Sequence, residues 1–222
     1  MKIIKNFSLV VINRRAVLTE GWLAGKLPAE RKTMLKPFYQ GKLDTFCAIY
    51  AVLNALRLTH GIRTLNARDL LNETLLSLAD RPGALRAVLE QGTDYLDLVD
   101  NLLAAAGKKF PLKIHKPFEG NDRPPPREVW KTCQAWFEGG TPRAVVLRFL
   151  RSLKPEAPPL SRHWTTADRM DDKSLHLFDC SHEAEAILNI RRESFVTRQE
   201  EVNNEQLLFI QPSSLRFLRL PF

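Results

Sequence analysis

Residues 38–56 read FYQGKLDTFCAIYAVLNAL, a polar turn followed by a run that is apolar on every side of a helix. A helix that is apolar all round is buried, so this run predicts the central helix of the fold. Cys47 stands in its first turn, where the positive end of the helix dipole favours a thiolate. Asp44 and Thr45 are both good N-caps, and Gly61 offers a left-handed C-cap. The sequence therefore predicts a cysteine held at the start of a core helix.

Length, composition and charge favour a single basic domain. The chain has 222 residues, 44% of them hydrophobic, which is enough to bury one good core. The net charge of +8 favours acidic partners. The arginines and lysines are scattered along the chain and no nucleic-acid-binding motif accompanies them, so nucleic acid is not an expected partner.

The cysteines and the apolar runs favour a cytoplasmic location. Three cysteines without short paired spacing fit a reducing compartment better than a disulfide framework. The apolar run at residues 7–12 is too short for a secretory core and predicts a strand. No apolar run has the length that a bilayer requires, so we expect no association with a membrane.

The order of the predicted elements indicates an α+β fold. Residues 1–37 form an N-terminal extension or strand, and whether it is a fixed part of the fold, a lid or a pro-segment stays open. We expect one domain over residues 1–222, with a helical half at 38–109 whose central helix packs on a mostly antiparallel sheet formed by 110–222. Further helices are expected at 66–78, 83–89, 93–107 and 127–137, and strands at 110–115, 144–149, 175–179, 186–190, 207–210 and, as an edge strand, 215–220.

One set of side chains has the composition of a thiol active site. A nucleophilic cysteine needs a base for its proton, a group that orients the base, and donors for the developing oxyanion. Cys47 is the candidate thiol, His163 stands at the head of a strand, and Asp179 ends the next strand. Gln40, seven residues before the thiol, has an amide able to donate to an oxyanion.

The spacing of His163 and Asp179 makes a prediction about register. If residues 163–179 form one hairpin with a loop centred on Asp171, positions whose numbers sum to 342 face each other. His163 then lies directly opposite Asp179 on the same face of the sheet. A slip of one residue would turn Asp179 to the other face.

The remaining histidines and cysteines are weaker candidates. His60 is roughly 20 Å along the helix axis from Cys47, and His176 lies in mid-strand, where a structural or surface role is expected. Cys133 and Cys180 are expected to be packing residues. Cys180, His176 and His182 offer three possible ligands without the paired spacing of a zinc site, so we expect no metal, and no nucleotide-binding motif predicts another cofactor.

Four short segments, in this order, resemble the papain-like cysteine peptidases, and among them the C39-like branch of bacterial peptidase domains: Gln40-Gly41, Phe46-Cys47-Ala48, Arg162-His163-Trp164 and Leu177-Phe178-Asp179. The resemblance covers these segments and the order of the elements. It implies that Cys47 is the nucleophile, that His163 is the base and later the acid, and that Asp179 orients His163. It also implies an oxyanion hole made by Gln40 and the backbone N–H of Cys47.

The sequence thus predicts a cysteine peptidase-type hydrolase acting on a peptide or isopeptide bond of a protein or peptide substrate. Two alternatives stay open. One keeps the same thiol site but transfers an acyl group to an amine, or deamidates glutamine. The other is a non-catalytic basic binding module.

Overall fold

The computed structural model describes residues 35–41, 44–90, 95–121, 123–140, 142–152, 154–155, 161–181 and 187–221. The helices are α2 (Cys47–His60), α3 (Thr64–Ala79), α4 (Ala84–Leu89), α5 (Tyr95–Gly107) and α6 (Pro126–Glu138). The strands are β1 (Lys113–His115), β2 (Arg143–Arg151), β3 (Ser161–Met170), β4 (Ser174–Leu177), β5 (Asn189–Arg191), β6 (Phe195–Val196), β7 (Leu208–Ile210) and β8 (Arg216–Arg219), with 3-10 turns η1 (Gln199–Glu201) and η2 (Pro212–Ser214). The strand predicted at 7–12 and the start predicted for the helix at 93–107 lie outside the described residues.

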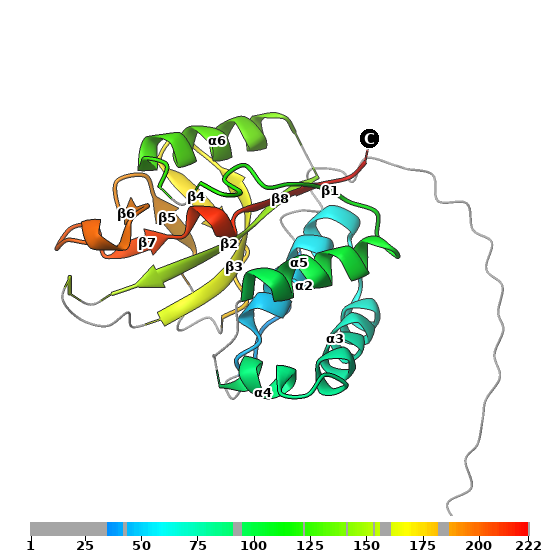
Figure 1. The fold of residues 1–222 in the computed structure, drawn as a ribbon. Helices are drawn as coiled ribbons and strands as arrows, with labels where there is room; N and C mark the ends of the chain where they lie inside the picture. The colour runs from blue at the N-terminus through cyan, green and yellow to red at the C-terminus, as the bar shows by residue number, and fades with distance from the viewer. Residues whose placement is uncertain are drawn as a thin grey trace, which may run out of the picture.

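The fold is α+β, as the sequence predicted. Helices α2 to α5 gather beside one face of the sheet and α6 covers the other (Figure 1). Helix α2 packs directly on β2 and β3. Because both faces are covered, the central strand β2 is an almost continuous apolar run, with Val145 and Val146 buried on opposite sides.

Helix α2 is the buried helix that its sequence predicted, although its N-terminus differs in detail. The helix begins at Cys47, with Phe46 as a cap that makes no side-chain bond. Asp44 instead accepts the backbone N–H groups of Phe46 (3.2 Å) and Gly41 (2.9 Å), and so shapes the turn that precedes the helix. Gly61 ends the helix in the left-handed conformation, with φ of 66°, as predicted.

Eight strands of the described chain form one sheet in the order β1-β8-β2-β3-β4-β5, with β7 on β2 and β6 on β7. Only the pairing of β6 with β7 is parallel. The prediction that the C-terminal strand lies at an edge is wrong, because β8 pairs with β1 on one side and β2 on the other. Arg216 is tolerated there because its guanidinium forms a 2.6 Å ion pair with Asp100 of α5.

The β3–β4 hairpin differs from the predicted register. Met170 faces Leu175, a sum of 345, because the Asp171 carboxylate folds a tight turn onto the N–H groups that follow it. A β-bulge between Ala167 and Arg169 then changes the register, so that Ala167 faces Leu177, a sum of 344. The predicted sum of 342 is therefore wrong. Beyond the bulge, however, it differs from the observed sum of 344 by two, an even number, so Asp179 stays on the face of the sheet that carries His163.

The described helices include none that is both long and apolar enough to cross a membrane.

Candidate active site

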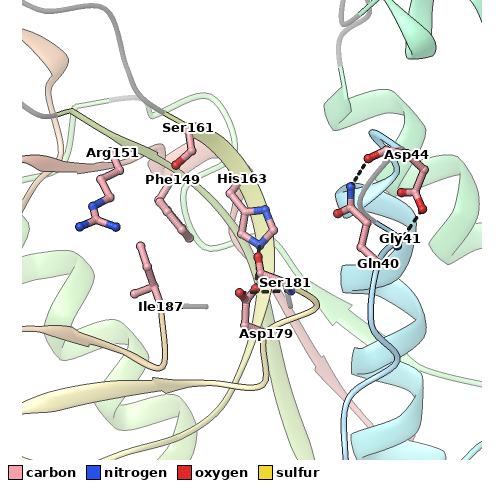
Figure 2. Close-up of a pocket in the computed structure, with 10 residues that line it drawn as sticks. All are labelled: Gln40, Gly41, Asp44, Phe149, Arg151, Ser161, His163, Asp179, Ser181 and Ile187. Carbon is pink, nitrogen blue, oxygen red and sulfur yellow. Dashed lines mark hydrogen bonds and ion pairs between the residues drawn. The ribbon is translucent and has the colours of Figure 1, made fainter. Parts of the chain in front are cut away.

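His163 and Asp179 are in direct contact. The imidazole Nε2 of His163 lies 2.7 Å from Oδ1 of Asp179, as Figure 2 shows. Asp179 lies two residues beyond the end of β4, and its side chain is almost completely buried. Thr165 donates its hydroxyl to the same Oδ1 at 2.7 Å, and the backbone N–H of Ser181 donates to Oδ2 at 3.3 Å. The carboxylate is therefore fixed by three donors.

The imidazole has a defined orientation. Phe149 pairs with His163 across β2 and β3, and the two rings meet edge to face with centroids 5.5 Å apart. Since Nε2 is engaged with Asp179, the other ring nitrogen, Nδ1, points away from that carboxylate, on the side of the ring nearer Gln40 (Figure 2). This nitrogen is the one available to a thiol or a substrate.

Cys47 shares a pocket with His163. The thiol is partly exposed at the N-terminus of α2. A hydrogen bond between it and His163 helps to raise the pKa of the imidazole. The pocket has a volume of about 200 Å3 and also contains Gln40. Its lining combines the start of α2, the start of α5 and the sheet: Gln40, Asp44, Thr45, Cys47, Tyr95, Arg148, Arg162, His163 and Trp164.

The protonation states of His163 and Asp179 shift in opposite directions. Burial by itself lowers the pKa of His163, but hydrogen bonds to Asp179, Cys180 and Cys47 together raise it well above its usual value. Burial by itself raises the pKa of Asp179, but the bond and the charge of His163 lower it. Both directions favour an imidazolium paired with a carboxylate.

Gln40 connects the helical half to the sheet. Its backbone N–H donates to the carbonyl of Cys180 at 2.8 Å, so the segment before α2 is held against the chain that carries Asp179. Its side-chain Nε2 donates to the carbonyl of Asp44 at 2.5 Å. A carboxamide carries two N–H donors, and the second one is what an oxyanion would use. The structure therefore brings all four predicted site residues to one place.

Asn54 is a positioning residue that the sequence reasoning missed. It is fully buried in α2, where its Oδ1 accepts the N–H of Phe38 at 2.7 Å and its Nδ2 donates to the carbonyl of Phe38 at 3.2 Å. These two bonds fix the segment that ends in Gln40. The sequence contained a sign of this role, because Asn54 stands in the middle of an apolar helix and a buried amide must find hydrogen-bond partners.

We expect Asn54→Leu to lower the free energy of unfolding by about 2 to 4 kcal/mol, because both backbone groups of Phe38 lose their partner. The loosened segment also slows alkylation of Cys47. Thermal denaturation and the alkylation rate check the two effects. Asn72→Leu, which replaces an exposed amide in α3, serves as the control. Equal stability of the two variants would contradict the role of Asn54.

Cys180 lies inside the site, although the sequence predicted only a packing role for it. Its sulfur is fully buried, 3.9 Å from Nε2 of His163 and 3.9 Å from Oε1 of Gln40. Burial raises the pKa of this thiol. Cys180 is thus enclosed and protonated, whereas Cys47 faces a pocket, so Cys47 is the better placed nucleophile.

The possible metal ligands are also arranged differently from the three considered in the sequence. Nε2 of His163, a carboxylate oxygen of Asp179 and the sulfur of Cys180 lie within 4.8 Å of one another. His176 lies elsewhere, with its Nε2 2.7 Å from Asp171, and His182 lies outside the described residues. A cation at the cluster would have to replace the proton between His163 and Asp179. The arrangement therefore favours proton transfer.

A second pocket adjoins the first one. It has a volume of about 240 Å3 and shares Gln40, Asp44 and His163 with the pocket of Cys47. Figure 2 shows its other side, which carries Ser161 and Arg151 at the ends of β3 and β2. Its lining residues are Gln40, Gly41, Asp44, Phe149, Arg151, Ser161, His163, Asp179, Ser181 and Ile187. The two pockets thus adjoin at Gln40, Asp44 and His163.

The histidine of α2 lies at the end of the helix opposite Cys47, as predicted. His60, at the opposite end of the helix, has its Nε2 3.0 Å from the carbonyl of Pro111.

Comparison with known proteins adds no assignment: no protein-family model matches the chain, and no curated protein matches it significantly.

Proposed function

We propose that the protein is a papain-like thiol hydrolase, of the C39-like type, that cleaves a peptide or isopeptide bond. One observation carries the proposal: Cys47, His163 and Gln40 line a single pocket, and His163 is held by the buried carboxylate of Asp179. The four groups supply a nucleophile, an acid–base, an orienting group and an oxyanion donor.

The arrangement supports a two-step acyl transfer. The Cys47 thiolate attacks the carbonyl carbon, and the oxyanion accepts hydrogen bonds from the backbone N–H of Cys47 and from Gln40. The imidazolium of His163 gives its proton to the leaving amine, which departs as the thioester forms. Neutral His163 then takes a proton from water, the hydroxide attacks the thioester, and the thiolate returns with the release of the acid.

The local structure of the thiol favours this chemistry over a packing role. Cys47 is the first residue of α2, so unpaired backbone N–H groups and the positive end of the helix dipole lie beside its sulfur. His163, the base that the proposed mechanism requires, lies in the same pocket. The α+β layout, with this helix on an antiparallel sheet that carries His163, also suits a papain-like enzyme.

Mass spectrometry of the products tests the proposal. We expect the wild-type protein, incubated with a peptide library that includes isopeptide-linked branches, to generate new amino and carboxyl termini, and Cys47→Ala to generate none. Acyl transfer would instead join a peptide to an added amine, and deamidation would change a glutamine without cleaving the chain. The absence of any product that depends on Cys47 would contradict a catalytic function.

A further inference from the structure

We infer that His163, Asp179 and Cys180 form a binding site for a zinc ion, and that zinc bound there inhibits the thiol site by replacing the proton on Nε2 of His163. The inhibition rests on the proposed function and adds a regulator, a divalent metal ion, to it. The site includes a group that the proposed mechanism does not use, the buried sulfur of Cys180 beside the imidazole.

The three side chains have the ligand atoms and the spacing that zinc requires. Nε2 of His163 lies 2.7 Å from Oδ1 of Asp179 and 3.9 Å from Sγ of Cys180, and the ligand atoms of the three residues lie within 4.8 Å of one another. In a tetrahedral zinc site, the nitrogen lies about 3.4 Å from a carboxylate oxygen and about 3.6 Å from a sulfur. Shifts of less than about 1 Å therefore convert the hydrogen-bonded cluster into a metal site.

The donor set selects zinc over the common hard cations. Mg²⁺ and Ca²⁺ take oxygen ligands, whereas zinc takes a thiolate, an imidazole and a carboxylate together. When the ion binds, Nε2 of His163 and the thiol of Cys180 each release one proton to solvent, and Asp179 contributes its carboxylate. The two negative ligands then balance the charge of the ion.

Other groups already hold the ligands in place. Thr165 donates its hydroxyl and Ser181 donates its backbone N–H to the carboxylate of Asp179, as outer-shell partners of a metal ligand do. The carbonyl of Cys180 accepts the backbone N–H of Gln40 at 2.8 Å. The three ligands are therefore arranged before an ion arrives, which reduces the entropic cost of binding it.

An ion reaches the cluster through the pocket of about 240 Å3, which His163, Asp179 and Ser181 line. The hydroxyl of Ser181 lies 3.2 Å from Nε2 of His163, so this hydroxyl, or a water molecule that enters from the pocket, can be the fourth ligand. Three protein ligands with one exchangeable position make an open zinc site, which binds and releases its ion in response to the zinc concentration.

Zinc on Nε2 stops proton transfer by the imidazole. Because Nε2 is engaged with Asp179, Nδ1 is the nitrogen available to a thiol or a substrate. A metal on Nε2 leaves one proton on the ring, at Nδ1, and loss of that proton would create an imidazolate. His163 can then neither accept the proton of Cys47 nor protonate a leaving amine, so the proposed hydrolysis stops.

Cobalt spectroscopy tests the metal site without an enzymatic assay. The chain has three cysteines, so Cys47→Ala combined with Cys133→Ala leaves Cys180 as the only thiol. After treatment with EDTA, we expect this double variant to bind Co²⁺ with a sulfur-to-cobalt charge-transfer band, and Zn²⁺ to displace the cobalt. Cys180→Ser in the wild-type chain loses the band and binds Zn²⁺ at least about 100-fold more weakly. A band that requires Cys47, or no band at all, would overturn the inference.

A kinetic assay separates this inference from the proposed function. We expect saturating Zn²⁺ to lower the rate of peptide hydrolysis by the wild type at least about 100-fold, and EDTA to restore it. Cys133→Ala, whose thiol packs between α6 and the sheet, is the matched control and stays sensitive to zinc, whereas Cys180→Ser does not respond to the same concentration. Hydrolysis that continues with zinc bound would overturn the inference. A cobalt band from Cys180 in a protein that hydrolyses no peptide would overturn the proposed function alone.

Discussion

We expect that replacing Cys47 by alanine abolishes covalent labelling of the native protein by iodoacetamide and lowers the rate of the proposed hydrolysis by at least about 10⁴-fold. The reason is accessibility combined with chemistry. Cys47 is partly exposed in the pocket of His163, whereas Cys133 and Cys180 are buried. Burial raises the pKa of Cys133 to about 12 and also raises that of Cys180. Intact-protein mass spectrometry and a kinetic assay measure the two effects.

Cys180→Ala is the matched control for this experiment. It removes the other thiol near His163 while Cys47 stays in place, so we expect one label per chain and measurable hydrolysis. Cys133→Ala should behave in the same way, since Cys133 packs between α6 and the sheet. Labelling that disappears in Cys180→Ala and persists in Cys47→Ala would transfer the role of nucleophile to Cys180.

For the proposed hydrolysis, we expect that replacing Asp179 by asparagine moves the alkaline limb of the pH profile of kcat/KM to lower pH by about 1 to 3 units. The wild-type carboxylate stabilises the imidazolium of His163 and raises its pKa, so the group proposed to protonate the leaving amine keeps its proton at high pH. Asparagine keeps the shape and removes the charge. Hydrolysis at alkaline pH therefore falls by roughly 10- to 1,000-fold. The pH profile and NMR titration of the imidazole nitrogens check both statements.

The His163–Asp179 pair also makes the free energy of unfolding depend on pH. The raised pKa of His163 stabilises the fold fully below the unfolded value near 6.5, and this contribution is lost as the pH rises toward the folded pKa. The lowered pKa of Asp179 stabilises above the unfolded value near 3.9 and is lost as the pH falls. The wild type therefore exceeds Asp179→Asn in unfolding free energy most strongly between about pH 4 and 6.5. Thr165→Val removes one hydrogen bond to Asp179 but keeps the charge, so we expect it to change the pH profiles of kcat/KM and of unfolding free energy less than Asp179→Asn does. An alkaline limb that does not move in Asp179→Asn would contradict the proposed role of the pair.

The sequence was most informative where one physical effect dominates. The apolar run after Cys47 permitted only a buried helix, and Gly61 marked its end. The helical patterns in the first half of the chain, followed by strand patterns in the second half, predicted the α+β layout. His163 and Asp179 were singled out because a thiol needs a base and an orienting group, and the structure places them in contact.

The sequence failed where distant groups compensate for a local pattern. Arg216 looked like an edge-strand residue because its partner, Asp100, lies on a helix far away in the chain. The hairpin register depends on the Asp171 turn and on one bulge, neither of which follows from strand periodicity. Cys180 and Asn54 act through bonds to Gln40 and Phe38, which the fold alone brings near.

The bulge between Ala167 and Arg169 also sets how the hairpin can change in length. Because strand faces alternate, the contact between His163 and Asp179, 16 residues apart, survives only changes that preserve parity. A one-residue deletion in β3 turns the carboxylate to the α2 side, whereas a paired deletion, one in each strand, keeps it beside the imidazole. We therefore expect a single insertion or deletion in this hairpin to separate the two side chains unless a further bulge restores the register, as the existing bulge does.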